Sequence, residues 1–270
     1  MKLAIIGYGK MGRILEGIAL DRGHRVTAVV DPFFSGAAPV SGASLNGSIA
    51  ESKALDEADV ALEFTRPETA AANIRALLER GVPTVTGTTG WHDSLEEITA
   101  LTAAKKGSLC WSSNYSLGVN LFYRIAAFTA KLADPFPEYD VGGWEFHHNK
   151  KVDSPSGTAK ILTEKVLAAM TRKKKAVYQT LESRPPAADE LHFPSLRLGS
   201  MPGLHALAFD SPADTIEITH TARSRDGLAL GAIRAAEWLV NAAPGKPAGT
   251  ARMGVFTIDD VMEDILKDLG

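Results

Sequence analysis

Short apolar runs alternate with amphipathic stretches over the first 116 residues of the chain. Apolar runs at residues 2–6, 24–31, 58–64, 82–86 and 108–111 predict buried strands. The segments between most of them place apolar residues at helical spacing, and glycines end the predicted helices. This alternation predicts an α/β fold with a doubly wound, mostly parallel sheet. Residues 35–50 are rich in Gly, Ala and Ser, and we expect a loop there.

The pattern changes near residue 117, where we place a domain boundary. An amphipathic helix is predicted over residues 119–132, followed by a strand over 138–147 and a helix that opens at Gly157-Thr158. Runs at residues 191–198, 204–209 and 215–221 predict an open, largely antiparallel sheet. The helix at 93–107 is expected to start at an Asp93 or Ser94 cap. A long helix over 228–240, then a short strand and a capped helix from Gly254 onward, are expected to return to the first domain.

A glycine-rich turn joins the first predicted strand to the first predicted helix. It reads Gly7-Tyr8-Gly9-Lys10-Met11-Gly12, and Asp31 ends the next strand. Glycines in this context let a pyrophosphate approach the backbone, and the acid accepts hydrogen bonds from the adenine ribose. A βαβ unit without a cofactor remains the alternative, but the order strand, turn, helix and acid favours a dinucleotide site.

Asp31 also bears on the choice of cofactor. Its charge repels a 2′-phosphate, and Pro32-Phe33-Phe34 offers no arginine to hold one. Lys10 and Arg13 lie nearby and could partly offset the repulsion. The sequence therefore favours NADH over NADPH.

Segments that contain small hydroxyl or amide residues recur at the ends of other predicted strands. They are Phe64-Thr65, Gly87-Thr88-Thr89 and Ser112-Ser113-Asn114-Tyr115. Ligands of doubly wound sheets bind at the carboxyl ends of the strands, and hydroxyl and amide groups suit ribose and carboxamide. Each segment alone could be ordinary turn chemistry, so the prediction depends on their agreement.

The segment from Glu145 to Thr158 concentrates groups suited to acid–base chemistry. His147 and His148 can exchange protons near neutral pH, and Lys151 adds a positive charge. Gly157-Thr158 opens a helix, whose free N–H groups and dipole suit an anion. An isolated His pair or helix start is usually structural. Together they predict a site that holds a carboxylate and protonates a neighbouring group.

Composition limits the class of protein. The chain has 270 residues, 45% hydrophobic and 23% charged, with a net charge of −3, so no nucleic-acid footprint is visible. Its single cysteine, Cys110, excludes an internal disulfide and cannot build a metal cluster, so we expect a buried inert thiol and no metal. Lys173-Lys174-Lys175 is expected to be a solvated helix end. No signal peptide or membrane-length apolar run is seen, which favours a cytoplasmic protein.

The segment Glu145–Ala159 resembles the signature of the 4-hydroxy-tetrahydrodipicolinate reductase (dihydrodipicolinate reductase) family. The likeness extends to Gly7–Arg13, Gly87–Gly90, Asn114–Asn120 and Ile218–Arg225, in the same order along the chain. It implies an NADH- or NADPH-dependent reduction of a cyclic imine dicarboxylate in lysine biosynthesis. It also implies a dinucleotide-binding domain of residues 1–116 and 227–270, and a substrate-binding domain of residues 117–226 whose sheet forms a homotetramer.

The resemblance assigns roles residue by residue. His147 is the expected proton donor and Lys151 the second one. His148, Gly157 and Thr158 are expected to contact the substrate carboxylates. The cofactor is expected to contact Gly7, Tyr8, Gly9, Lys10, Met11, Gly12, Asp31, Gly87, Thr88, Thr89, Ser112, Ser113, Asn114 and Tyr115.

The sequence departs from the family pattern at four single positions and at Asn149-Lys150, although the spacing to Lys151 is kept. Many members carry arginine at Lys10 and a basic residue at Pro32, which puts NADPH use in doubt; aspartate is more usual at Glu63 and phenylalanine is common at Tyr115. Two other readings remain: another two-domain NAD-linked dehydrogenase, or an NAD-binding sensor without catalysis. The former would lack the His-His-x-x-Lys and Pro-Ser-Gly-Thr segments, and the retained His147 and Lys151 argue against the latter.

Overall fold

The computed structural model describes residues 1–267 as two compact units. The first comprises Met1–Leu117 and the chain from Arg225 onward, and the second is Gly118–Ser224. None of the helices within residues 1–267 is long and apolar enough to cross a membrane.

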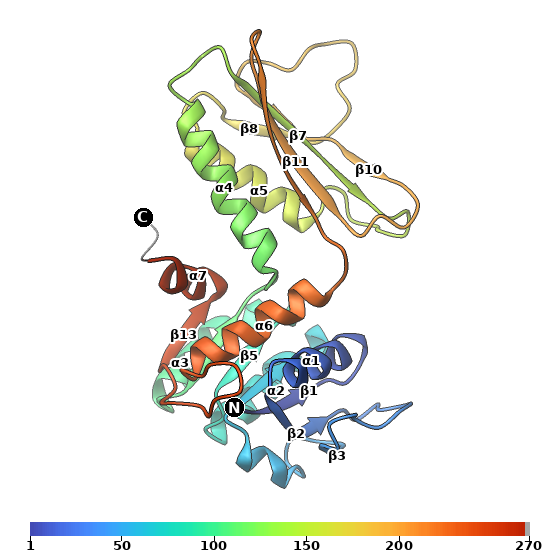
Figure 1. The fold of residues 1–270 in the computed structure, drawn as a ribbon, viewed down its shortest axis with the longest axis vertical. Helices are drawn as coiled ribbons and strands as arrows, with labels where there is room; N and C mark the ends of the chain where they lie inside the picture. Colours follow the sequence, from blue (N-terminus) through green and yellow to red (C-terminus); the bar gives the residue numbers. More distant parts are fainter. Residues whose placement is uncertain (268–270) are drawn as a thin grey trace. The chain divides into compact units, whose positions relative to one another are not determined.

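The first unit is built on a seven-stranded parallel sheet with the order β13-β6-β5-β4-β1-β2-β3 (Figure 1). The strands are β1 (Lys2–Ile6), β2 (Arg25–Val30), β3 (Ser44–Asn46), β4 (Val60–Glu63), β5 (Thr84–Thr86), β6 (Ser108–Trp111) and β13 (Gly254–Thr257). β13 pairs with β6, so the predicted return of the C-terminal segment is confirmed. The loop expected over residues 35–50 is partly wrong, because β3 pairs with β2 there. That strand is three residues long and largely exposed, so it has no apolar run to reveal it.

Helices cover both faces of this sheet. α1 (Lys10–Asp21) packs with α6 (Asp226–Leu239), and α2 (Pro67–Glu79) packs with α3 (Leu95–Ala104). α7 (Ile258–Leu266) contacts α6 and starts with the predicted cap, a reciprocal pair of hydrogen bonds between Thr257 and Asp260. The predicted cap of α3 is wrong in detail. A short 3-10 helix, η2 (His92–Ser94), leads directly into α3, and Ser94 makes no side-chain cap bond. A second 3-10 helix, η1 (Lys53–Glu57), precedes β4.

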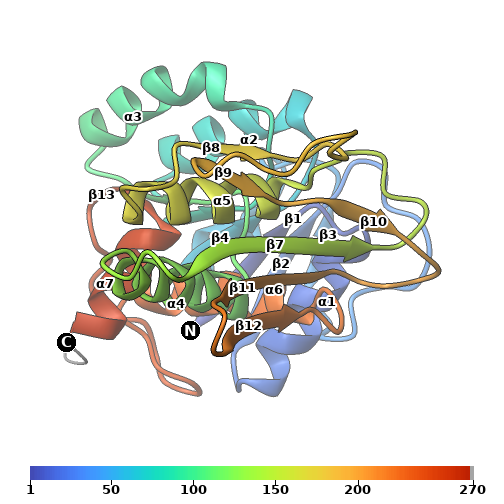
Figure 2. The ribbon, with the colours of Figure 1, turned by 90° about the horizontal axis from the view of Figure 1, so that it is seen from above.

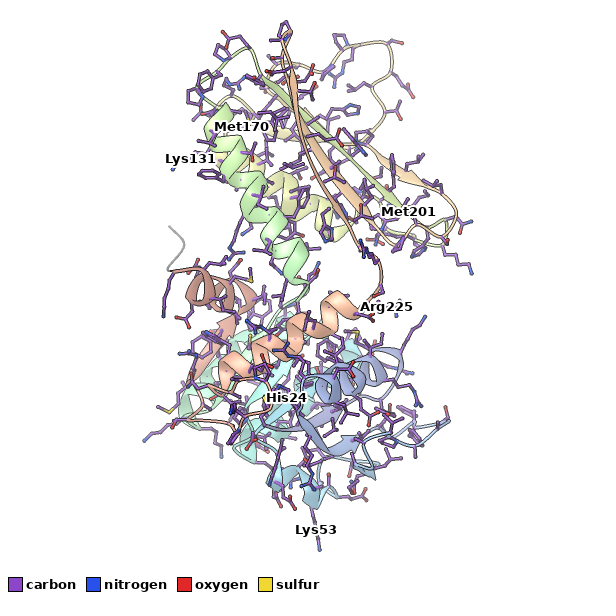
Figure 3. All side chains as sticks on the ribbon, viewed as in Figure 1. His24, Lys53, Lys131, Met170, Met201 and Arg225 are labelled. Carbon is purple, nitrogen blue, oxygen red and sulfur yellow. The ribbon has the colours of Figure 1, made fainter. Side chains whose placement is uncertain are left out.

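A buried ion-pair cluster fixes α6 against the turn that follows α1. Arg22 donates two hydrogen bonds of 2.8 Å to Glu237, and Nε2 of His24 (labelled in Figure 3) lies 2.7 Å from the same carboxylate. Burial opposes the charge of Glu237, but the hydrogen bonds from Arg22 and His24 hold its pKa below the ordinary value. The position of α6 matters for function, since its first residues line a pocket of this unit.

The second unit has a mixed four-stranded sheet, β10-β7-β11-β12, with α4 and α5 against one face (Figure 2). Its elements are α4 (Leu117–Ala133), β7 (Asp140–His147), α5 (Gly157–Ala169), β10 (Ser195–Arg197), β11 (Leu204–Asp210) and β12 (Thr215–Thr221). β11 is antiparallel to both neighbours, while β10 is parallel to β7. The predicted run at 191–198 is divided, because β9 (Glu190–His192) pairs with β8 (Lys175–Val177) in a separate sheet.

The lysine cluster after α5 differs from its prediction. Lys173 is buried, and its ammonium donates a 2.7 Å hydrogen bond to the carbonyl oxygen of Glu190. Its long aliphatic stem, the carbonyl partner and an ion pair with Asp140 allow that burial. The run of three lysines is therefore not a uniformly solvated helix end.

Candidate active site

Three glycines in the β1–α1 turn have different steric surroundings. A Cβ on Gly7 would lie 2.3 Å from the carbonyl oxygen of Phe64, and one on Gly12 would lie 2.2 Å from that of Gly7. A Cβ on Gly9 would meet none of the described atoms within 4 Å. The fold itself therefore requires Gly7 and Gly12. Gly9, the N-cap of α1, instead leaves the helix N-terminus open to a phosphate.

The carboxylate of Asp31 is fixed at the end of β2. Its two oxygens accept the backbone N–H groups of Tyr8 at 2.7 Å and Phe33 at 2.8 Å. Each oxygen keeps lone pairs that can accept ribose hydroxyls. The Tyr8 side chain is buried and its hydroxyl bonds to Glu16, so only the Tyr8 backbone is available at the turn. Burial, together with Glu16, raises the pKa of Tyr8 to about 12.

A pocket of about 510 Å³ lies beside Asp31. Three of the predicted cofactor residues, Gly7, Gly9 and Asp31, line it, and so does Arg66, which was not among the predicted contacts. The Arg66 guanidinium lies 5.4 Å from the centroid of the Phe33 ring. Arg66 lies three residues after the end of β4 and is the N-cap residue of α2, and that position after a strand end was the signal that could have found it.

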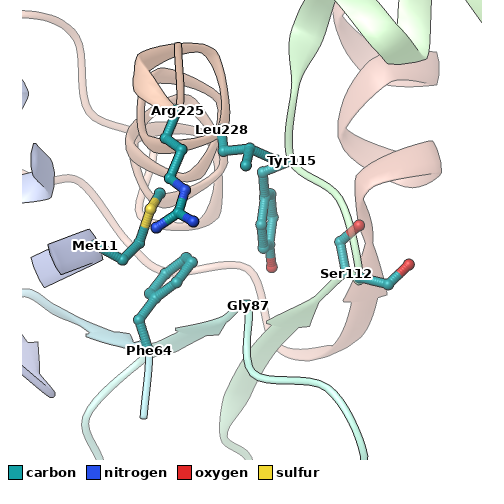
Figure 4. Close-up of a pocket in the computed structure, with 8 residues that line it drawn as sticks. Met11, Phe64, Gly87, Ser112, Tyr115, Arg225 and Leu228 are labelled. Atoms are coloured by element: carbon teal, nitrogen blue, oxygen red, sulfur yellow. The ribbon is translucent and has the colours of Figure 1, made fainter. Parts of the chain in front are cut away.

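A second pocket of about 210 Å³ lies in the same unit (Figure 4). Five of the predicted cofactor residues line it: Met11, Gly87, Ser112, Ser113 and Tyr115. Phe64, Arg225 and Leu228 also line it and were not among the predicted contacts. Figure 4 shows the Arg225 guanidinium directed into the pocket, between Met11 and Tyr115. Arg225 is the N-cap residue of α6, a part of the chain far from the glycine-rich turn in sequence.

Several predicted cofactor contacts have structural roles. The Tyr115 hydroxyl donates to the carbonyl oxygens of Cys110 and Thr86, at 2.9 and 3.0 Å, so it is occupied inside the core. Cys110 is buried, and burial raises the pKa of its thiol to about 12, as expected for an inert thiol. Thr88 accepts the backbone N–H of Thr65 at 2.8 Å. Lys10, Gly12, Thr89 and Asn114, like Tyr8 and Thr88, do not line either pocket.

The two pockets suit a dinucleotide. One is bordered by a ribose-binding acid and an arginine, the other by small polar residues and aromatic rings, and the glycine-rich turn lies at the first. All of these groups belong to one unit. The open position at Gly9 is the observation that fits a bound pyrophosphate.

The second unit brings the predicted acid–base groups onto one connection, from β7 to α5. His147 is the last residue of β7 and is buried, whereas His148 is half-buried. Lys151 pairs with Asp153, with 2.8 Å between Nζ and Oδ1, and that hydrogen bond lowers the pKa of Asp153.

The start of α5 presents the residues predicted to hold a carboxylate. Ser156 is the N-cap and accepts the backbone N–H of Ala159 at 3.1 Å. Gly157 follows it and is exposed, and a Cβ there would meet no described atom within 4 Å. Thr158 is half-buried. The first turn of the helix is therefore open at its N-terminus, which suits an anion.

A histidine absent from the predicted site lies against His147. Nε2 of His205 on β11 is 3.4 Å from Nε2 of His147, and both are 3.2 Å from Oε2 of Glu145. These three side chains could hold a metal ion, although the sequence pattern predicted none. No local spacing reveals His205, because β11 reaches β7 only through the sheet pairing.

The fold and these two sites define a two-domain reductase with a Rossmann-type nucleotide unit. The models of the dihydrodipicolinate reductase N-terminus and C-terminus match residues 1–115 and 118–262. The chain belongs to the dihydrodipicolinate reductase family. It is therefore an NAD(P)H-dependent oxidoreductase, and its reaction is the reduction step of lysine and diaminopimelate biosynthesis, as the sequence predicted.

Individual relatives agree with the family models over nearly the whole chain. The 4-hydroxy-tetrahydrodipicolinate reductase of Christiangramia forsetii is 34% identical, over 99% of this chain and 100% of its own length. That of Chromobacterium violaceum is 37% identical, over 96% and 97%. Among solved structures, a dipicolinate-bound dihydrodipicolinate reductase from Paenisporosarcina sp. TG-14 shares the fold, with a TM-score of 0.74 and 22% identity over 95% and 97% of the two chains.

Proposed function

We propose that the protein reduces 4-hydroxy-tetrahydrodipicolinate, by way of dihydrodipicolinate, to tetrahydrodipicolinate. The observation that carries this proposal is the β7–α5 connection, which contains His147 and Lys151 and leads into an open helix N-terminus at Gly157. A bound nicotinamide supplies the hydride. The protein supplies the proton and holds the two carboxylates of the substrate.

His147 and Lys151 act as the proton donors. Hydride addition to a conjugated imine leaves electron density on the ring, which a positioned acid must neutralise. The buried imidazole of His147 is the first donor, and the ammonium of Lys151 is the second. Since Asp153 pairs with Lys151, binding of an anionic substrate exchanges one carboxylate partner of the ammonium for another.

The substrate carboxylates bind at His148, Gly157 and Thr158. Two free backbone N–H groups and a hydroxyl at a helix N-terminus form an anion site, and neighbouring cations strengthen it. The dipicolinate named with the Paenisporosarcina relative is a cyclic dicarboxylate of this kind, which supports the substrate class.

The cofactor is NADH in preference to NADPH, bound by the glycine-rich turn, Asp31 and the predicted strand-end residues. Asp31 is aimed at the ribose position, and Arg13 is engaged by the carbonyl oxygens of Ala37 and Ser35 at 3.0 and 3.3 Å. Arg66 is the remaining cation at this pocket. Its place beside Phe33 suits a stacking contact with adenine.

Each of the two predicted domains has its own role. Residues 1–116 and 227–270 bind the nucleotide, and residues 117–226 bind the substrate and form a homotetramer through their sheet. The enzyme works in the cytoplasm on a small molecule and uses no metal.

A coupled assay tests the reaction. Pyruvate, aspartate semialdehyde and a dihydrodipicolinate synthase generate the substrate, and nicotinamide absorbance is followed with NADH and then with NADPH. We expect oxidation that depends on the synthase and is faster at low concentrations of NADH than of NADPH. Nicotinamide binding without oxidation would instead support a non-catalytic sensor, and a preference for NADPH would overturn the assignment of the cofactor.

A further inference from the structure

Glu145 lies at the centre of a buried polar cluster on the sheet of the second unit. It precedes His147 by two residues on β7, so both side chains lie on the same face. His205 on β11 and Ser195 on β10 are the residues paired with Glu145 in the register of the sheet. The Glu145 side chain is completely buried. A charge in such a place is retained only where neighbouring groups compensate it.

One oxygen of Glu145 is anchored by three groups of the scaffold. Oε1 accepts the backbone N–H of Ser156 at 3.0 Å, the hydroxyl of Ser195 at 2.8 Å and the guanidinium of Arg197 at 3.2 Å. These donors come from the N-cap of α5 and from β10. They fix the plane of the carboxylate and therefore the direction of its second oxygen.

The second oxygen lies at ion-pair distance from two imidazoles, and it accepts no hydrogen bond within residues 1–267. Oε2 lies 3.2 Å from Nε2 of His147 and 3.2 Å from Nε2 of His205. Burial opposes the charge of Glu145, but these imidazoles and the anchoring groups hold its pKa well below the ordinary range. Burial also lowers the pKa of His205, which favours its neutral form. One ionised carboxylate is thus shared by two rings.

A glycine lies against the His147 ring near Cε1 and Nδ1. A Cβ on Gly203 would lie 3.0 Å from Cε1 and 3.3 Å from Nδ1 of His147, tighter than ordinary packing allows. Gly203 also has a φ of +150°, a conformation that other residues rarely adopt. Any side chain at this position would crowd the Nδ1 edge of the ring.

We propose that Glu145 is the positioning residue of His147, holding a proton on Nε2 so that Nδ1 exchanges the proton with the substrate. In the transfer, the N–H bond at Nδ1 breaks, its electron pair stays on the ring, and the proton goes to the substrate. Nε2 keeps its proton beside Glu145. His205 shares the carboxylate and limits rotation of the His147 ring. The inference rests on the proposed role of His147 as the proton donor.

A metal ion at the same three side chains is the competing explanation. The three ligand atoms are 3.2–3.4 Å apart, a spacing that a tetrahedral ion could bridge. Two features oppose it. Arg197 already neutralises Glu145, and Nδ1 of His205 has no hydrogen-bond partner in residues 1–267, whereas metal-bound histidines normally donate from the second nitrogen.

The test compares Glu145→Gln with Glu190→Gln. Glu190 is also a buried, ion-paired carboxylate of the second unit, but its partners are Arg184 and Lys175. We expect Glu145→Gln to lower kcat on the order of 100-fold and to leave the KM for NADH within about twofold, as for loss of the acid that orients a catalytic histidine. Nitrogen-15 NMR should show His147 losing its preference for a proton on Nε2. Glu190→Gln should change neither.

Further variants distinguish a folding defect from an error in the role of Glu145, an error in the role of His147, or a metal site. Glu145→Asp keeps the charge, so it should recover part of kcat relative to the glutamine variant, and it serves as the second variant if that protein does not fold. Unchanged kcat and unchanged nitrogen shifts in Glu145→Gln would overturn the inference. Full turnover in His147→Gln would remove the proposed role of His147 itself. Activity lost on dialysis against EDTA and restored by Zn²⁺ would replace the inference with a metal site.

Discussion

The backbone N–H of Tyr8 donates to Oδ2 of Asp31 over 2.7 Å, so the glycine-rich turn and the acid at the end of β2 are held together. The bond fixes the glycine-rich turn, which we propose binds the pyrophosphate, relative to the acid that we propose binds the ribose. Asp31 is thus a structural partner of the turn as well as a proposed ligand group.

Asp31→Ala should weaken NADH binding more than NADPH binding. The ribose hydrogen bonds disappear for NADH, whereas for NADPH their loss is offset by relief of repulsion with the 2′-phosphate. We expect the KM for NADH to rise on the order of 10-fold, the equivalent of about 1.4 kcal/mol. Steady-state kinetics with both cofactors measures this. An equal rise for both would show that the turn, rather than the ribose contact, was lost.

Gly9→Ala and Gly12→Ala should separate binding from folding. A Cβ on Gly9 enters open space, so the folded state should lose less than about 1 kcal/mol, while NADH binding should weaken because the methyl group occupies the phosphate position. A Cβ on Gly12 would lie 2.2 Å from the carbonyl oxygen of Gly7, so that variant should lose about 1–3 kcal/mol. Thermal unfolding and NADH titration measure the two effects. Normal NADH affinity in Gly9→Ala would argue against a pyrophosphate there.

His147→Gln should lower kcat by roughly 10²–10⁴-fold, the usual contribution of a positioned general acid. NADH binding should be unchanged, because the predicted cofactor residues all belong to the other unit. Single-turnover kinetics and NADH titration test the two statements. His192→Gln is the matched control, since that imidazole bonds to the carbonyl oxygen of Gln179 in the same unit and away from His147. Loss of NADH affinity in His147→Gln would contradict the assignment.

The sequence predicted the elements and the local motifs better than the contacts across them. Gly9, Asp31, His147 and Gly157 lie in short segments whose chemistry is visible along the chain. His205 and Arg225 reach their sites through sheet pairing and helix placement, which no local spacing encodes.

Predictions also failed where tertiary packing overrides a local pattern. Lys173 is buried because its ammonium bonds to a carbonyl oxygen of Glu190 and pairs with Asp140, and β3 forms by pairing with β2. The Tyr115 hydroxyl donates to a carbonyl oxygen in the core, while the residue also lines the smaller pocket, so its predicted cofactor contact stays a prediction. Burial and pairing partners are properties of the folded chain, so composition alone does not reveal them.

Glu190→Gln should change how stability depends on pH. Hydrogen bonds from Arg184 and from the backbone N–H of Ala187 lower the pKa of Glu190 from 4.5 to about 2 in the folded protein. Because the pKa is lower in the folded protein, the charged Glu190 adds to the free energy of unfolding. This contribution is fully present above pH 4.5 and is lost as the pH falls toward 2.

The variant lacks this contribution. It should therefore unfold at a lower temperature than the parent at pH 7, and the difference should shrink steadily below pH 4.5. Thermal unfolding monitored by circular dichroism at pH 7, 4.5 and 3.5 measures the difference directly. A difference that stays constant across this range would show that Glu190 stabilises the unit through packing, with no coupling to its charge.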